Sequence, residues 1–132
     1  MTRLHFQPIQ GKSLDIIDAI IQAEEVAPVA DAWGNLSVVV EELVLNIVDY
    51  SHSDYLDVEM MCDDKSLELR FHDGGIPFNP LEREFPDFSI PMEDRKIGGL
   101  GIFMVIQYMD HVAYEHTGGE NILTVMKRIK NK

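Results

Sequence analysis

The chain has one cysteine, no long apolar run and no leader-like start, and each of these shortages excludes a class of protein. Cys62 is the only cysteine among 132 residues, so an internal disulfide is excluded. Because Cys62 falls in a strand-like run, we expect a buried and inert thiol there. No apolar run approaches the length of a membrane span, and no apolar segment with a cleavage site opens the chain. We therefore expect a cytoplasmic protein that does not bind a membrane.

Basic residues are also scarce. The chain has 11 Lys and Arg against 23 Asp and Glu, which gives a formal net charge of -12. Binding to nucleic acid or to an anionic membrane requires a basic face, so this balance argues against both. The acidity serves either solubility or a protein partner that is basic where it makes contact.

The composition is that of a folded protein, with 45% hydrophobic and 26% charged residues, and the length fits a single domain over 1–132. Period-two alternation and turn residues predict strands, and apolar residues at helical spacing predict helices. We expect strands at 4–9, 55–62, 66–72, 112–116 and 122–129, and helices at 14–26 (N-capped by Ser13), about 35–50 and 102–109. Helices and hairpins segregate along the chain. This order predicts an α+β two-layer sandwich with three helices on one face of a mixed, mostly antiparallel sheet.

The predicted helix over 35–50 carries polar residues inside an apolar run. Glu42 and Asn46 are four residues apart, so they stack on one helical face, and Tyr50 continues that face at the next turn. The core stripe of this helix is expected to be Leu36, Val39, Val40, Leu43 and Ile47. A carboxylate and a carboxamide in such a helix cost free energy unless something satisfies them. Glu42 and Asn46 either meet solvent at the helix border or belong to a site.

Two glycine-rich segments follow. Asp73-Gly74-Gly75 ends a predicted strand, where glycine lets a ligand approach the backbone and a carboxylate can accept from an exocyclic amine. The second segment, Gly98 to Gly101, leads into a predicted helix, and the exposed N–H groups of a helix start favour an anion. Taken singly, the first segment is also compatible with a plain turn and the second with a flexible loop return.

The three motifs, in this order, resemble those of the GHKL (histidine-kinase-like) ATPase superfamily, and within it those of the small bacterial anti-sigma factor serine kinases. Glu42 and Asn46 match the N box, and Asp73 with Gly75 matches the G1 box. Gly99, Leu100 and Gly101 match the G2 box, with Gly98 ahead of it. The resemblance spans nearly the whole chain and implies a Bergerat-type ATP-binding fold.

The resemblance also implies roles for these residues. Asn46 would ligate a Mg²⁺ ion that bridges the phosphates of ATP, and Glu42 would act as general base on the attacking hydroxyl. Asp73 would receive the adenine amino group, and Gly75 would leave room for the base. The G2 glycines, Gly98, Gly99 and Gly101 around Leu100, would lie against the phosphates through backbone N–H groups.

Other residues near these motifs are further candidates. Arg95 and Lys96 form the only adjacent basic pair near the motifs, so one of them reaches a phosphate or both are solvated loop charges. Tyr50 contacts either the nucleotide or the core. The segment 81–97 would be a lid over ATP. The family often begins its last strand with Gly-Thr, whereas this chain has Glu120-Asn121-Ile122 there and Thr124 further on.

The implied function is that of an ATP-dependent serine/threonine protein kinase. It would bind a sigma factor and phosphorylate an anti-anti-sigma (STAS-type) partner, and the family commonly pairs two such domains as a homodimer. The alternatives are a nucleotide-sensing sequestering module with little or no kinase activity, and a slow ATPase coupled to another partner. A histidine sensor kinase is not expected, because no histidine lies in a dimerisation-helix context.

Overall fold

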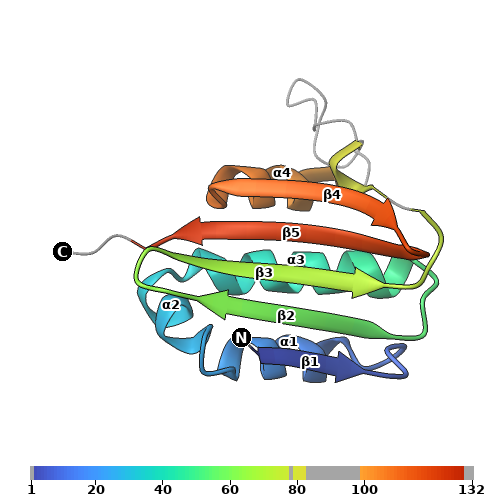
Figure 1. The fold of residues 1–132 in the computed structure, drawn as a ribbon, viewed down its shortest axis with the longest axis horizontal. Helices are drawn as coiled ribbons and strands as arrows, with labels where there is room; N and C mark the ends of the chain where they lie inside the picture. The colour runs from blue at the N-terminus through green and yellow to red at the C-terminus, as the bar shows by residue number, and fades with distance from the viewer. Residues whose placement is uncertain (1, 78, 83–98, 130–132) are drawn as a thin grey trace.

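The computed structural model describes residues 2–77, 79–82 and 99–129. Five strands form one sheet in the order β1-β2-β3-β5-β4 (Figure 1). Their bounds are Thr2–Phe6 for β1, Leu56–Cys62 for β2, Ser66–Asp73 for β3, His111–Thr117 for β4 and Glu120–Arg128 for β5. Every pairing in this sheet is antiparallel, so it is not mixed as the sequence had suggested.

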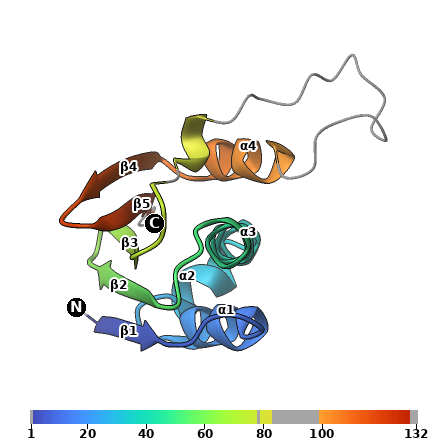
Figure 2. The same ribbon diagram turned by 90° about the vertical axis from the view of Figure 1, so that its right-hand side faces the viewer.

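The helices lie on one side of the sheet, which gives two layers (Figure 2). They are α1 (Ser13–Gln22), α2 (Ala27–Ala32), α3 (Asn35–Tyr50) and α4 (Gly99–Tyr108), and a short 3-10 turn spans Pro80–Glu82. The predicted α+β sandwich with helices on one face is confirmed. The described part of the chain has four α-helices where three were expected, because α2 was not predicted: it begins after the end of the first predicted helix, over 14–26.

The first predicted helix, over 14–26, ends early, at Gln22. The chain leaves helical geometry at Ala23 and resumes it at Ala27, with Pro28 in the first turn of α2. Proline is well tolerated there, because the first N–H groups of a helix have no intrahelical acceptor. Ser13 is the first residue of α1 and not its N-cap: Lys12 holds that position, without a side-chain cap. The predicted capping role of Ser13 is therefore wrong.

The core fills the space between α3 and the inner face of the sheet. The predicted stripe of α3 is confirmed, since Leu36, Val39, Val40, Leu43 and Ile47 are all buried. Facing them, the central strands bury alternate residues, among them Val58, Met60, Leu69, Phe71 and Val125. Complementary side-chain periods in helix and strands thus build one core and fix which face of each strand is buried.

Cys62 is exposed at the end of β2, so the prediction that it is buried is wrong. Residual desolvation and the neighbouring carboxylates, Asp63 first among them, raise the pKa of its thiol. A raised pKa disfavours the thiolate, which is the reactive form. Among the described residues, no helix has the length and apolar character needed to span a membrane.

Candidate functional site

Helix α3 holds Glu42 and Asn46 together in the folded protein. The Asn46 side chain is 4% exposed, and its Nδ2 donates to both the backbone oxygen and Oε1 of Glu42, each at 2.8 Å. These two bonds fix the orientation of the amide, because only its nitrogen can donate. Oδ1 of Asn46 accepts no hydrogen bond from the residues that the structure describes. It remains available as an oxygen ligand.

The first turn of α4 lies directly against the carboxylate of Glu42. A Cβ atom added at Gly101 would stand 2.0 Å from both Cδ and Oε1 of Glu42, so only glycine fits beside this conformation. Helix α4 starts at Gly99 and not at Ile102 as expected, so Gly99-Leu100-Gly101 forms its first turn. The structure thus brings the predicted N box and the predicted G2 box together.

Asp73 ends β3 and is 3% exposed. Its Oδ1 accepts hydrogen bonds from the backbone N–H of Gly75 at 2.9 Å and from Nδ2 of Asn121 at 3.0 Å. Burial raises the pKa of Asp73 above its ordinary value, and the hydrogen bonds from Asn121, Gly75 and Ser51 oppose this increase. The carboxyl group is therefore buried, positioned and still able to accept further hydrogen bonds.

Asn121 is a site residue that sequence reasoning missed. It is 3% exposed and pairs with Asp73 across the β3–β5 ladder, and its Nδ2 also donates to the backbone oxygen of Ile76 at 2.7 Å. The hydroxyl of Tyr114 on β4 donates to its Oδ1. Thr124, considered for this role from the sequence, is three residues along β5 and therefore on the opposite face of the sheet. The alternation of β5 was the available signal, because it places Asn121 with the buried Leu123 and Val125.

The loop after Asp73 is packed against the end of α3 through backbone atoms. A Cβ at Gly75 would lie 1.9 Å from the backbone oxygen of Ser51, and the N–H of Ile76 donates to that same oxygen at 2.9 Å. The N–H of Gly74 donates to Oγ of Ser53 at 3.0 Å. Gly75 is thus required for the close approach of two backbone segments. That it also leaves room for a base stays a prediction.

These segments enclose a small cavity between α3, the ends of β3 and β5, and the start of the 3-10 turn. It is lined by Leu43, Asn46, Ile47, Asp73, Pro80, Tyr114, Asn121 and Leu123. Its volume is about 10 Å³, which is room for about one water molecule. The polar lining is contributed mainly by Asn46, Asp73 and Asn121, so one face of α3 and one end of the sheet converge on the same space.

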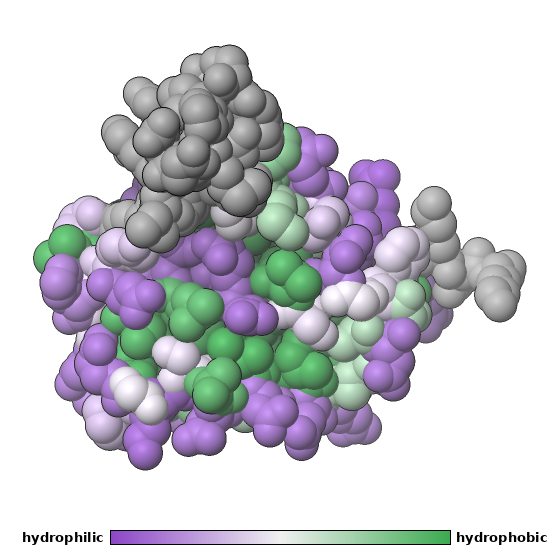
Figure 3. Space-filling model, turned by 180° about the vertical axis from the view of Figure 1, so that it is seen from behind, coloured by the Kyte–Doolittle hydropathy of each residue, from purple (hydrophilic) through white to green (hydrophobic). Residues whose placement is uncertain are grey.

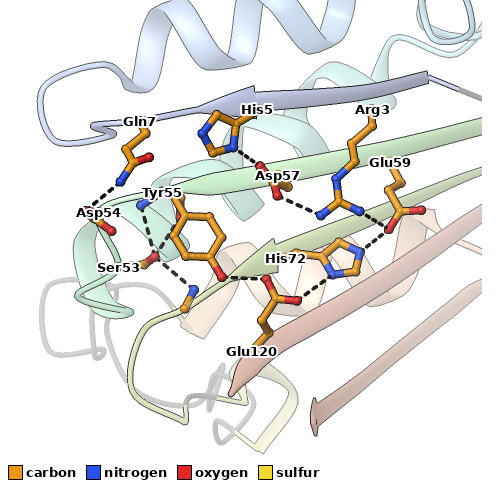
Figure 4. A network of polar contacts seen from close by, with 11 residues as sticks. Arg3, His5, Gln7, Ser53, Asp54, Tyr55, Asp57, Glu59, His72 and Glu120 are labelled. Carbon is orange, nitrogen blue, oxygen red and sulfur yellow. Dashed lines mark hydrogen bonds and ion pairs between the residues drawn. The ribbon is translucent and has the colours of Figure 1, made fainter. Parts of the chain in front are cut away.

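A polar network lies on the outer face of the sheet, next to the loop of Gly74 (Figure 4). Tyr55 donates from its hydroxyl to Oε2 of Glu120 at 2.6 Å, and its ring stands where a side chain at Gly74 would be. The hydrogen bond to Glu120, together with burial and the surrounding carboxylates, raises the pKa of Tyr55 to about 12. His72 lies between two carboxylates: its Nε2 is 2.5 Å from Oε1 of Glu59, and its Nδ1 is 3.6 Å from Oε1 of Glu120. Neither ring nitrogen makes a hydrogen bond with good geometry to the described residues.

The remaining predicted site residues lie apart from the cavity or outside the described residues. Tyr50 ends α3 one turn beyond Asn46 and is 40% exposed, so the alternative that its ring is core is wrong. It does not line the cavity. Arg95, Lys96 and Gly98 lie outside the described residues, as does the predicted lid from residue 83 onward.

Comparisons with known proteins bear on the family and the fold of this chain. The chain is 22% identical to the anti-sigma F factor of Clostridium acetobutylicum over 109 residues, which cover 80% of this chain and 76% of that protein. Its fold is similar to that of the Acinetobacter baumannii histidine kinase AdeS, with a TM-score of 0.55 at 13% identity, over 99% of this chain and 69% of the other. Residues 13–127 match the family model of the histidine kinase-like ATPase domain. The predicted superfamily is thereby confirmed: the chain belongs to the histidine kinase-like ATPase family.

Proposed function

We propose that this protein binds Mg·ATP between α3, α4 and the ends of β3 and β5, and that it phosphorylates a serine or threonine of a partner protein. The observation that carries the proposal is the meeting of Glu42, Asn46 and Gly101, because it joins a carboxylate, an oxygen ligand and a helix N-terminus. These are the three groups that phosphoryl transfer from a magnesium nucleotide requires.

The residues present fit both the metal and the nucleotide. Asn46 would hold Mg²⁺ through Oδ1, the hard oxygen that its hydrogen bonds leave available. Asp73 would accept from the adenine amino group, since Gly75 and Asn121 occupy only part of its hydrogen-bonding capacity. The cavity beside Asp73 is smaller than a base, so the lining side chains have to move apart when the nucleotide enters.

Glu42 would take the proton of the attacking hydroxyl. As the hydroxyl oxygen forms its bond to the γ-phosphorus, the bond from that phosphorus to the β-phosphate oxygen breaks and ADP leaves. The proton goes to the carboxylate of Glu42. Bound Mg²⁺ would neutralise phosphate charge during this transfer. The backbone N–H groups at the start of α4, around Gly99, Leu100 and Gly101, would hold the phosphates. Gly98, Arg95, Lys96 and Tyr50 are proposed to assist there.

The partners are proposed from the relatives. An anti-sigma F factor among them supports a sigma factor as the sequestered partner. An anti-anti-sigma protein of STAS type is proposed as the phosphorylated partner from the resemblance of the three motifs to those of the anti-sigma factor serine kinases. In this proposal residues 1–132 act as one ATPase domain in the cytoplasm and pair as a homodimer.

One observation favours a second function. Oε1 of Glu42 is already occupied by Asn46, and the carboxylate is pressed against Gly101. A carboxylate held in this way serves a nucleotide-sensing module that sequesters its partner without transferring phosphate.

The two functions are separated by incubating the protein with labelled ATP, Mg²⁺ and an anti-anti-sigma protein of STAS type. Transfer of label to a serine of that protein, lost in Glu42→Gln while ATP binding is retained, is the expected result. ATP binding without transfer supports the sequestering module. Absence of ATP binding by calorimetry overturns both.

A further inference from the structure

The helix layer carries charge of one sign only. Residues 13–50, which contain α1, α2 and α3, include eight acidic residues and no lysine, arginine or histidine. The acidic residues are Asp15, Asp18, Glu24, Glu25, Asp31, Glu41, Glu42 and Asp49. Helix α4 has no charged residue. Lys12 directly precedes the segment 13–50, and His52 is two residues beyond its end. A large part of the net charge of -12 is therefore concentrated in this layer.

An apolar patch lies in the middle of this acidic layer. Leu14 is 83% exposed and Val38 is 41% exposed, and the partly buried Ile17, Ile21 and Leu45 belong to the same helices. Seen from the helix side, hydrophobic residues gather in a patch bordered by hydrophilic ones (Figure 3). We call these five residues the helix-face patch.

The patch extends across two helices that pack against each other. Nε2 of Gln10 donates to the backbone oxygen of Val48 at 2.8 Å, which places the beginning of α1 beside the end of α3. The two helices therefore run antiparallel. Helical spacing puts residues 14, 17 and 21 on one side of α1, and residues 38 and 45 on one side of α3. An apolar surface formed by packed helices is one onto which an amphipathic helix can lay its apolar face.

We infer that the helix-face patch is the docking surface for a basic amphipathic helix of a partner protein. Its apolar side would cover Leu14 and Val38, and its lysines and arginines would meet the surrounding carboxylates such as Asp18 and Glu41. Charge complementarity selects this occupant. A second copy of the chain, related by a two-fold axis, would bring one acidic layer against another, which is repulsive.

The surface adjoins the proposed nucleotide site through α3. Glu41 is exposed on the patch side, and the next residue, Glu42, faces Gly101. A partner docked here would contact the same helix that holds Asn46. Under the proposed function this partner is the sequestered sigma factor, and the inference rests on that function for the identity of the partner alone.

The test uses a synthetic helix of leucine and lysine, with the leucines on one face, as the probe. Its control is the same helix with glutamate in place of lysine. Wild-type protein is expected to bind the lysine helix and not the glutamate helix. Leu14→Ser with Val38→Ser should weaken binding by about tenfold or more, the effect of losing central apolar anchors. Ile76→Ser is the matched control, because Ile76 is 53% exposed and lies in the loop after β3, outside the helix-face patch, and binding should stay within about twofold.

The charge component has its own matched pair of variants. The double variant Asp18→Asn with Glu41→Gln should weaken binding of the lysine helix and reduce the dependence of that binding on salt concentration. The control, Asp64→Asn with Glu115→Gln, removes the same charge outside the helix layer. It should change neither the affinity nor its salt dependence. All four residues are exposed. Equal losses in both pairs would mean attraction by net charge alone and would overturn the inference.

Three other results would also overturn it: equal binding of the glutamate helix, equal loss in Ile76→Ser, or a wild-type dimer that Leu14→Ser with Val38→Ser dissociates. Calorimetry of the same proteins with Mg·ATP keeps the two proposals separate. Peptide binding without ATP binding counts against the proposed function and leaves the docking surface standing. ATP binding without peptide binding overturns the docking surface and leaves the proposed function standing.

Discussion

Gly101 and Glu42 are in such close contact that a methyl group at position 101 would lie 2.0 Å from the carboxylate carbon of Glu42. The two residues are far apart in sequence and belong to different helices. Their contact couples the placement of α4 to the conformation of one side chain.

Gly101→Ala should displace Glu42 without unfolding the protein, because a carboxylate at the end of a flexible side chain can move. The displaced carboxylate loses its bond to Asn46, and we expect phosphotransfer to fall by about tenfold or more. The melting temperature should change little. In a Glu42→Ala background, where transfer is already lost, the same substitution should leave ATP affinity unchanged, and a loss of affinity there would contradict the coupling.

Asn46→Ala should abolish the dependence of ATP binding on Mg²⁺. The substitution removes Oδ1 and two hydrogen bonds to Glu42. Calorimetry with and without a chelator should show a large affinity difference in the wild type and none in the variant. Asn46→Asp keeps an oxygen ligand and is the control. A variant Asn46→Ala that still responds to the chelator would remove Asn46 from the metal site.

Asp73→Asn should weaken discrimination between ATP and GTP. The asparagine can keep Oδ1 as acceptor for Gly75 and Asn121, but the amide replaces an acceptor oxygen with a donor. Competition binding with the two nucleotides is the measurement. Asn121→Ala should weaken ATP binding as well, by freeing the carboxylate of Asp73. Equal affinity of the wild type for ATP and GTP would count against this contact.

The raised pKa of Asp73 gives stability a pH dependence of defined sign. Burial makes the folded protein hold the proton more tightly than the unfolded chain does. This contribution is full below the unfolded pKa and is lost as pH rises through the folded pKa. From about pH 7 down to about pH 4, the melting temperature of the wild type should therefore rise relative to that of Asp73→Asn. If the difference in melting temperature between the two proteins stays constant or falls as the pH is lowered, Asp73 is not desolvated.

The hydroxyl of Tyr55 should lose its proton only at high pH. Its pKa of about 12 results first from the hydrogen bond to Glu120, so the ultraviolet signal of one tyrosinate should appear well above the ordinary range. Glu120→Gln should bring that titration down toward the ordinary value of about 10. The stability linked to the raised pKa is present below that ordinary value and disappears as pH rises through the folded one. Tyr55→Phe identifies the signal, because it should remove this titration and no other.

Elements with a clear period were predictable from the sequence. The buried stripe of α3 was found because Leu36 to Ile47 repeat at helical spacing, and the strands were placed within a few residues by their alternation. The end of α1 at Gln22 was missed, because Ala23, Glu24 and Glu25 are compatible with a helix, whereas the backbone of Ala23 is extended. Cys62 was misplaced because it follows the alternation of its strand but lies at its exposed end.

The site was predictable where local motifs define it. Glu42, Asn46 and Asp73 could be chosen from the spacing of polar residues and glycines. Asn121 could not, because its contact with Asp73 depends on the pairing of β3 with β5, which joins segments that are distant in sequence. The register of such a pair is set by the whole core and not by the residues of either strand.

The loop of Gly74, Gly75 and Ile76 has three consecutive backbone N–H groups, and each donates a hydrogen bond: to Ser53, to Asp73 and to Ser51. Such a loop is as constrained as a strand, although it has no ladder. Its conformational entropy is lost when the chain folds and not when a ligand arrives. The half of the cavity that contains Asp73 is therefore preorganised before any ligand binds.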